Sequence, residues 1–396
     1  MKKLLLIISA ICCVSLFSCG DDEPEVVTPP TENPDDPSKP DPDDPDDPNK
    51  PDEPDDPNPG GIPTGSNLYA TGYSDAIMYS FWWNYQDKKL NALCSESENS
   101  EAHAIAVGDD GTIYIGGVLT SDEMNGYEAA ALWTNGKSQL LTKMDRPTDA
   151  AVYGLAIDGN DVWAAGFYRY LKADGWSFQR DAATLWKNGT QIDITHGERY
   201  AKAWDVKIKG DKAYVVGELN NADGFSVATM WTGDKNSTDW SNCETLSLGN
   251  GINHSYAEEM CIDGNDIYAV GNKTVTTGGE YKIAVMWKNG KETELSQLQS
   301  YATSVSVDKG IVYIAGWEYV EINGRDCAVA TLWVDGKAQH LYNKPHSSQA
   351  RCVIAKDGNV YVSGFIGDQA VIWINGEAGA LTDGTYPSCV TSLYLK

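Results

Sequence analysis

The sequence is poor in basic residues. Its 396 residues include 30 Lys and Arg against 57 Asp and Glu, which gives a formal net charge of −27 at pH 7. A protein that binds nucleic acid through the phosphates needs many basic side chains to replace the counterions. This composition therefore argues against a nucleic-acid-binding function.

Common catalytic and metal-binding motifs are absent. The sequence has no His-Glu-x-x-His, no Gly-x-Ser-x-Gly and no P-loop, and its five histidines lack metal-ligand spacing. We therefore name no catalytic residue and predict neither a metal nor a cofactor. A glycosidase needs two carboxylates roughly 5–10 Å apart. With so many acidic residues in the chain, such a pair can always be proposed from the sequence. A polysaccharide hydrolase or lyase therefore stays an alternative.

Long apolar runs are also missing, because the N-terminal stretch over residues 4–16 is too short for a stable membrane anchor. It follows two lysines and ends at Leu16-Phe17-Ser18-Cys19, so we predict a signal peptide over residues 1–18. The Leu-x-Ser-Cys sequence resembles the lipobox of bacterial lipoproteins. This resemblance implies cleavage before Cys19 and lipidation of Cys19 as the membrane anchor.

The residues after Cys19 favour display on the cell surface. Gly20-Asp21-Asp22-Glu23 resembles the export signal of Bacteroidota-type surface lipoproteins, which implies a location on the outer face of an outer membrane. Residues 20–60 then hold 16 acidic residues and 13 of the 17 prolines. Such a segment cannot bury enough apolar surface to fold, so we predict a disordered stalk over residues 19–61 that can reach on the order of 100 Å.

Two short patterns alternate through the rest of the chain. The first is aromatic-x-x-Gly, which ends at Gly72, Gly117, Gly166, Gly217, Gly271, Gly316 and Gly364. The second is small-x-x-Trp, which ends at Trp83, Trp133, Trp186, Trp231, Trp287, Trp333 and Trp373. Most of these tryptophans lead into a hairpin turn such as Thr134-Asn135-Gly136. The patterns indicate a strand-rich unit that recurs seven times.

Four short strands per unit at a period of about 48 residues are typical of a β-propeller. The first unit lacks its opening strand, and residues 390–395 resemble that strand without a unit of their own. We therefore predict an all-β, seven-bladed propeller over residues 62–396, with four antiparallel strands per blade and a ring closed by the C-terminal strand. The repeat resembles the Trp-Asn-Gly/Tyr-x-x-Gly propellers of Bacteroidota secreted proteins. The repeated Trp and Tyr side chains are expected in the blade cores.

Spacing between the patterns locates the variable face. With the strands of a blade called a to d from the ring centre outwards, strand a and the Gly of strand b are separated by 14 or 15 residues. The Gly and the Trp of strand c are separated by 9 to 20 residues. Because variable loops on a rigid scaffold usually carry binding residues, we expect the ligand on the face formed by b–c loops and d–a crossovers.

Aromatic side chains on that face are our candidate binding residues, because aromatic rings suit sugars, flat cofactors or a partner protein. The alternative is that individual rings only pack the loops onto the scaffold. The candidates are Tyr168, Arg169, Tyr170, Trp176, Phe178, Tyr200, Tyr256, Tyr301, Trp317, Tyr319 and Tyr386.

These features favour a surface-anchored, non-catalytic lipoprotein that captures a glycan or another nutrient, with possible transfer to an outer-membrane transporter. The anchor and blade count are similar to those of propeller lipoproteins that bind vitamin B12. A protein–protein adhesin or transport-complex subunit is the second hypothesis. After removal of the predicted signal peptide, six cysteines remain besides Cys19, at different places in different blades, so none is expected to be a nucleophile. Cys261, Cys327 and Cys352 are expected as small buried residues.

Overall fold

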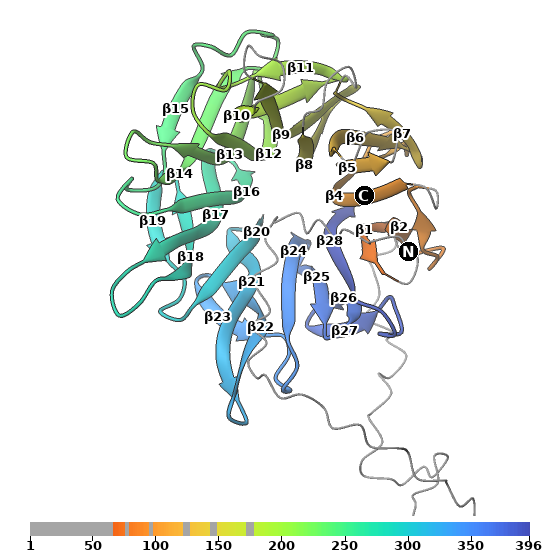
Figure 1. Cartoon of the computed structure of the whole chain (residues 1–396). Coiled ribbons are helices and arrows are strands. Elements are labelled where there is room, and N and C mark those ends of the chain that lie inside the picture. The colour runs from red at the N-terminus through yellow and green to blue at the C-terminus, as the bar shows by residue number, and fades with distance from the viewer. Residues whose placement is uncertain (1–65, 76–78, 95–97, 122–126, 143–148, 172–177) are drawn as a thin grey trace, which may run out of the picture. The chain divides into compact units, whose positions relative to one another are not determined.

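The computed structural model describes residues 66–75, 79–94, 98–121, 127–142, 149–171 and 178–396. These residues form seven antiparallel four-stranded sheets, which stand side by side as the blades of a ring (Figure 1). The predicted seven-bladed β-propeller is therefore confirmed. Within these ranges, no helix is long and apolar enough to cross a membrane.

The four strand positions are filled in the same way in every blade. Strand a, nearest the ring centre, is β28 (Ser388–Leu395), β4 (Glu98–Val107), β8 (Ala150–Asp158), β12 (Ala201–Lys209), β16 (Ser255–Asp263), β20 (Ser300–Asp308) and β24 (Ser348–Lys356). Strand b is β1 (Leu68–Ser74), β5 (Ile113–Ser121), β9 (Asp161–Leu171), β13 (Lys212–Asn220), β17 (Asp266–Val275), β21 (Ile311–Ile322) and β25 (Asn359–Ile366). Strand c is β2 (Tyr79–Asn84), β6 (Ala129–Thr134), β10 (Phe178–Lys187), β14 (Ser226–Asp234), β18 (Tyr281–Lys288), β22 (Arg325–Val334) and β26 (Gln369–Ile374). Strand d is β3 (Asn91–Ala92), β7 (Lys137–Leu140), β11 (Thr190–Asp193), β15 (Glu244–Ser247), β19 (Lys291–Glu294), β23 (Lys337–His340) and β27 (Glu377–Ala380).

The ring is closed by the last strand. β28 pairs with β1, and the register runs from Leu68 opposite Leu395 to Ser74 opposite Ser388. The Ser388 hydroxyl also donates a hydrogen bond of 2.8 Å to the Ser74 hydroxyl. The C-terminal strand therefore supplies strand a of the first blade, as the missing opening strand predicted, and the closure covers an otherwise open sheet edge.

A β-bulge explains the glycine of the aromatic-x-x-Gly pattern. Each strand a shifts its register opposite this glycine, for example between Ala302 and Ser304 opposite Gly316. A Cβ added at any of the seven glycines would lie 1.8 to 2.0 Å from a backbone carbonyl oxygen of strand a, which for Gly316 is that of Tyr301. Only glycine permits so close an approach of two backbones.

The tryptophans of strand c form the blade cores, as predicted. Six of the seven are at most 1 % exposed, and Trp83 is 6 % exposed. The Asn-Gly turns that follow place Asn135, Asn188, Asn289 and Asn375 at φ values near +50°. These side chains accept a hydrogen bond from the first strand-b amide or its neighbour, as in Asn289 Oδ1 to the Ile267 amide at 2.9 Å. The turn residues thus fix the hairpin and its position beside strand b.

The alternating strand directions divide the turns between two faces. The b–c loops and d–a crossovers lie on one face, here called the b–c face, and the a–b and c–d turns lie on the other. The insertion after Trp231 belongs to the c–d turn of its blade, so it lies on the opposite face, as predicted. Strand a begins and strand b ends at the b–c face, and these strand ends carry the candidate site.

Candidate functional site

One residue of each strand a lies in the bulge, close to the b–c face. The preceding residue is always Ala or Val and is fully or almost fully buried. The bulge residue itself differs chemically from blade to blade. In blade order from β28 it is Thr391, His103, Tyr153, Trp204, Glu258, Thr303 and Arg351.

Three neighbouring bulge residues form a stack of rings, here called the Tyr153 stack. The Tyr153 ring lies 4.3 Å from the Trp204 ring and 5.2 Å from the His103 ring, measured between centroids. Tyr153 is 8 % exposed. Within the described residues, its hydroxyl, the Trp204 indole nitrogen and Nε2 of His103 have no partner in hydrogen-bond geometry. The Trp204 N–H faces the Glu218 carboxylate and opposes the rise of its pKa, but the two groups are not aligned as a hydrogen bond. Fourteen buried side-chain nitrogen or oxygen atoms of the described residues lack a partner in hydrogen-bond geometry, seven of them tryptophan indole nitrogens, and the Tyr153 stack brings three of the fourteen together.

Burial keeps the titratable members of the Tyr153 stack neutral. Burial lowers the pKa of His103 to about 4, and burial with the nearby Glu128 charge raises the pKa of Tyr153 well above its ordinary value. Glu101, whose carboxylate lies 3.9 Å from His103 Nε2, also has a raised pKa, because nearby groups partly desolvate it and Glu128 carries a like charge; its side chain stays 53 % exposed. The stack therefore carries no charge at pH 7 and holds buried polar atoms.

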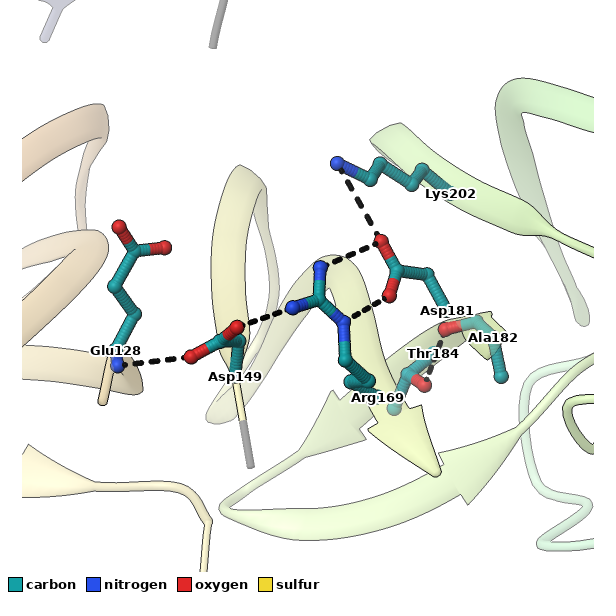
Figure 2. Close-up of polar contacts among 7 residues, drawn as sticks. All are labelled: Glu128, Asp149, Arg169, Asp181, Ala182, Thr184 and Lys202. Carbon is teal, nitrogen blue, oxygen red and sulfur yellow. Dashed lines mark hydrogen bonds and ion pairs between the residues drawn. The ribbon is translucent and has the colours of Figure 1, made fainter. Parts of the chain in front are cut away.

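Beside this stack lies an ion-pair network, here called the Arg169 cluster and shown in Figure 2. Arg169 of β9 bonds to Asp149 in the d–a crossover on one side and to Asp181 of β10 on the other, with Nε 2.6 Å from Asp181 Oδ1. The Lys202 ammonium approaches Asp181 to 3.7 Å and lies 4.4 Å from the centre of the Phe167 ring. Burial lowers the pKa of Arg169, but the carboxylates outweigh burial and the net pKa is raised.

On the other side of the ring, aromatic and basic residues form a second group, here called the Trp317 cluster. Tyr301 stacks on Trp317 with 4.7 Å between centroids and 17° between planes. The Arg351 guanidinium lies 5.0 Å from the centre of the Trp317 ring. The Lys282 ammonium lies 4.6 Å from the Tyr256 ring and 5.7 Å from the Tyr301 ring. Three neighbouring blades contribute to this cluster, through β16 and β18 of one, β20 and β21 of the next, and β24 of the third.

Glu258, the bulge residue of β16, borders the Trp317 cluster. Burial raises the pKa of Glu258 to about 7; the positive charges of Lys282 and Arg351 oppose this rise, and the charge of Glu218 adds to it. The Asn272 amide group lies 3.4 Å from its carboxylate. Burial also raises the pKa of Glu218, which is 3 % exposed. Glu258 is therefore a carboxyl group that gains and loses its proton near neutral pH.

The structure brings most of the sequence-predicted residues to the b–c face in different environments. Tyr168 and Tyr170 pack edge to face at 5.2 Å, and Tyr256 stacks on His254 at 6.4 Å. Tyr200 is half-buried, and burial together with Glu218 raises its pKa. Tyr319 is half-buried, whereas Tyr386 is 49 % exposed.

Two further predictions concern the longest b–c loop. Trp176 lies outside the described residues. Phe178 begins β10, opposite Leu171, and the placement of its side chain is likewise not described. Their part in binding stays a prediction.

The expectation of exposed rings is wrong for two candidates. Trp317 is 3 % exposed and Tyr301 is 7 % exposed. Tyr301 covers one side of Trp317, and Arg351 packs against the same indole. For these two residues the packing alternative holds. They shape the site and position the cations, and their faces are not free to stack on a sugar.

The sequence reasoning missed the bulge residues and Lys282. His103, Tyr153, Trp204, Glu258 and Arg351 each follow the small residue of the strand-a pattern, so an alignment of the seven units would have shown a chemically variable position between constant neighbours. Lys282 has no such signal, because it lies at the start of a strand c whose visible pattern begins two residues later.

Metal-binding side chains do not cluster in the described ranges, which contain no group of three or more His, Cys, Asp or Glu residues arranged to hold an ion. Cys327 and Cys352 are buried, as predicted, and Cys261 is half-buried. Burial raises the pKa of the Cys352 thiol to about 12 and also raises that of Cys261. Both thiols are therefore protonated at pH 7, in keeping with a packing role.

Several solved structures of other proteins are similar to this chain. No family model and no curated protein matches the sequence. An acylaminoacyl peptidase in complex with a chloromethyl ketone is similar over 81 % of this chain and 51 % of its own, with 16 % identity and a TM-score of 0.47. This chain thus spans about half the length of that peptidase. A PL25 ulvan lyase bound to a GlcA–Rha3S ligand is similar over 86 % of this chain and 93 % of its own, with 12 % identity and a TM-score of 0.49. Drosophila semaphorin 1a has 8 % identity and a TM-score of 0.43 over 81 % and 87 % of the two chains.

Proposed function

We propose that the b–c face of this propeller binds a glycan, and that the protein displays this face at the cell surface on its lipidated Cys19 and acidic stalk. The observation that carries the proposal is the Tyr153 stack. Its three rings present a hydroxyl, an indole N–H and an imidazole nitrogen, all buried and all without a partner in hydrogen-bond geometry among the described residues. Buried polar atoms normally have partners, and sugar hydroxyls supply both donors and acceptors.

The surroundings of the stack suit a sugar as well. Aromatic rings provide apolar contact area for the C–H faces of sugars, with a few polar groups to fix orientation. Carboxylates such as Glu101 accept hydrogen bonds from hydroxyl groups. Nutrient capture for an outer-membrane transporter is the role we favour for such a protein, and a protein–protein adhesin is the alternative.

An enzyme is the third candidate, and Glu258 is the observation that favours it. Its pKa of about 7 is suited to general acid or base catalysis at neutral pH. A glycan hydrolase needs a second carboxylate. Glu218 is the candidate, because it is the carboxylate whose charge raises the pKa of Glu258. Product formation separates this candidate from simple capture.

The test is a glycan-binding screen on the purified full-length protein, followed by calorimetric titration of each hit. Tyr153→Phe and Trp204→Phe should each weaken binding about 5- to 10-fold, because each removes one hydrogen bond to the ligand. Tyr313→Phe is the matched control, since Tyr313 lies at the other end of strand b. Unchanged affinity in both site variants would overturn the assignment. Reducing ends or unsaturated sugars in the mixture would show an enzyme.

A further inference from the structure

Two cations of the Trp317 cluster form no ion pair with a described carboxylate, although the charges of both act on the Glu258 carboxyl group. Eight Lys and Arg side chains in the described ranges are half-buried. Six of them form ion pairs with carboxylates: Arg169, Lys187, Lys202, Lys207, Lys235 and Lys273. The other two are Lys282 and Arg351, whose charged groups contact aromatic rings and form no ion pair with a described residue.

We propose that Lys282 and Arg351 bind an anionic substituent of the glycan, a carboxylate or a sulfate ester. This inference rests on the proposed glycan-binding function and names the ligand class. Lys282 contacts Tyr301 and Arg351 contacts Trp317 in the same stacked ring pair, and both cations act on the Glu258 carboxyl group, so they border one place on the b–c face. A half-buried cation is partly stripped of water, and ring contacts replace only part of that hydration.

The acidic character of the chain makes this exception informative. With a net charge of −27, carboxylates are abundant partners for any cation. The other six half-buried cations have found such partners. Ring contacts position the charged groups of Lys282 and Arg351, which form no ion pair with a described residue and so leave two donors for an incoming anion. A guanidinium binds carboxylate or sulfate oxygens in pairs, and an ammonium adds a point charge.

Glu258 adds a pH dependence to this site. The charged groups acting on it are Lys282 from β18, Arg351 from β24 and Glu218 from β13, and the neutral Asn272 of β17 also faces it. When ionised, Glu258 competes with an anionic ligand for the same two cations. Protonation removes this competition. Since its pKa is about 7, the affinity for anions should fall as the pH rises from 6 to 8.

The experiment titrates the full-length protein calorimetrically with four probes: a uronic-acid oligosaccharide, its carboxyl-reduced neutral form, a sulfated oligosaccharide, and sodium glucuronate alone. We expect at least tenfold weaker binding of an acidic probe by Lys282→Ala and by Arg351→Ala. Lys337→Ala is the matched control, because it removes the same charge from an exposed position in a c–d hairpin on the opposite face. Glu258→Gln should bind the acidic probe more tightly and with little change between pH 6 and 8.

Each result has a separate meaning. Preference for the carboxylated or the sulfated probe, lost in Lys282→Ala, supports the proposal and identifies the anion. Equal binding of acidic and neutral forms, unchanged by either substitution, overturns the anion site and leaves glycan binding intact. Lys282-dependent binding of glucuronate, with no binding of any oligosaccharide, supports the anion site while contradicting the proposed glycan function. Absence of binding to every anionic probe overturns the proposal.

Discussion

The Arg169 cluster and the Trp317 cluster both lie on the b–c face, but they hold their cations in different ways. In the first, Arg169 lies between Asp149 and Asp181, and Lys202 shares Asp181 (Figure 2). In the second, Lys282 and Arg351 contact aromatic rings and form no ion pair with a described residue. Charge on this face is therefore not by itself a sign of binding. A cation whose partners are complete supports the fold, and one whose partners are incomplete is available to a ligand.

The bulge geometry that all seven blades share gives the largest expected effect. Gly117 and Gly316 occupy the same bulge position on the two sides of the ring, and an added Cβ would lie 1.9 Å from a strand-a carbonyl oxygen in either case. Gly117→Ala and Gly316→Ala should each destabilise the protein by about 3 kcal/mol or more, because backbone must move. Chemical unfolding followed by circular dichroism measures this.

The control for the glycine substitutions is Gly159→Ala in an open turn. Gly159 has a φ of +60°, and a Cβ added there would have no neighbouring atom within 4 Å. Only the backbone conformation is therefore penalised, by about 1 kcal/mol. If Gly117→Ala and Gly316→Ala were no worse than this control, the bulge would not be what demands glycine.

Arginine substitutions test the comparison directly. Arg169→Ala should lower the free energy of unfolding by about 2–3 kcal/mol, because it leaves Asp181, which is 4 % exposed, without its main partner. Arg351→Ala removes a cation–π contact worth about 0.5–1 kcal/mol, and no described carboxylate loses an ion pair. Thermal or denaturant unfolding of the two variants under one buffer gives both values. Equal losses would show that Arg351 is as structural as Arg169.

Much of this molecule could be read from its sequence, and the limit has a physical cause. The tryptophan and glycine patterns recur because every blade meets the same packing and bulge constraints, so the blade number, strand order and ring closure were predictable. The site residues meet no repeated constraint. Trp317 was expected on the rim, but strand β21 extends through Ile322 and holds this ring beneath Tyr301. Pairing of Lys282 with rings rather than carboxylates depends on contacts within its own blade and with the next blade.

Buried titratable groups on the two sides of the ring make stability depend on pH in opposite directions, and this effect is among the smallest expected. Burial holds the pKa of His103 at about 4, below its ordinary 6.5, so the unfolded chain binds a proton first and stability falls as the pH drops from 6.5 toward 4. Burial raises the pKa of Glu258 from 4.5 to about 7, so the folded chain binds a proton first and stability rises as the pH drops from 7 toward 4.5.

His103→Asn should therefore lose less stability on acidification from pH 6.5 to 5 than the parent protein, and Glu258→Gln should lose more, each by on the order of 1 kcal/mol. Unfolding measured at both pH values checks the signs, and other titrating groups cancel because the variants share them. A shift of the same sign in both variants would contradict the opposite charge environments of the two sides.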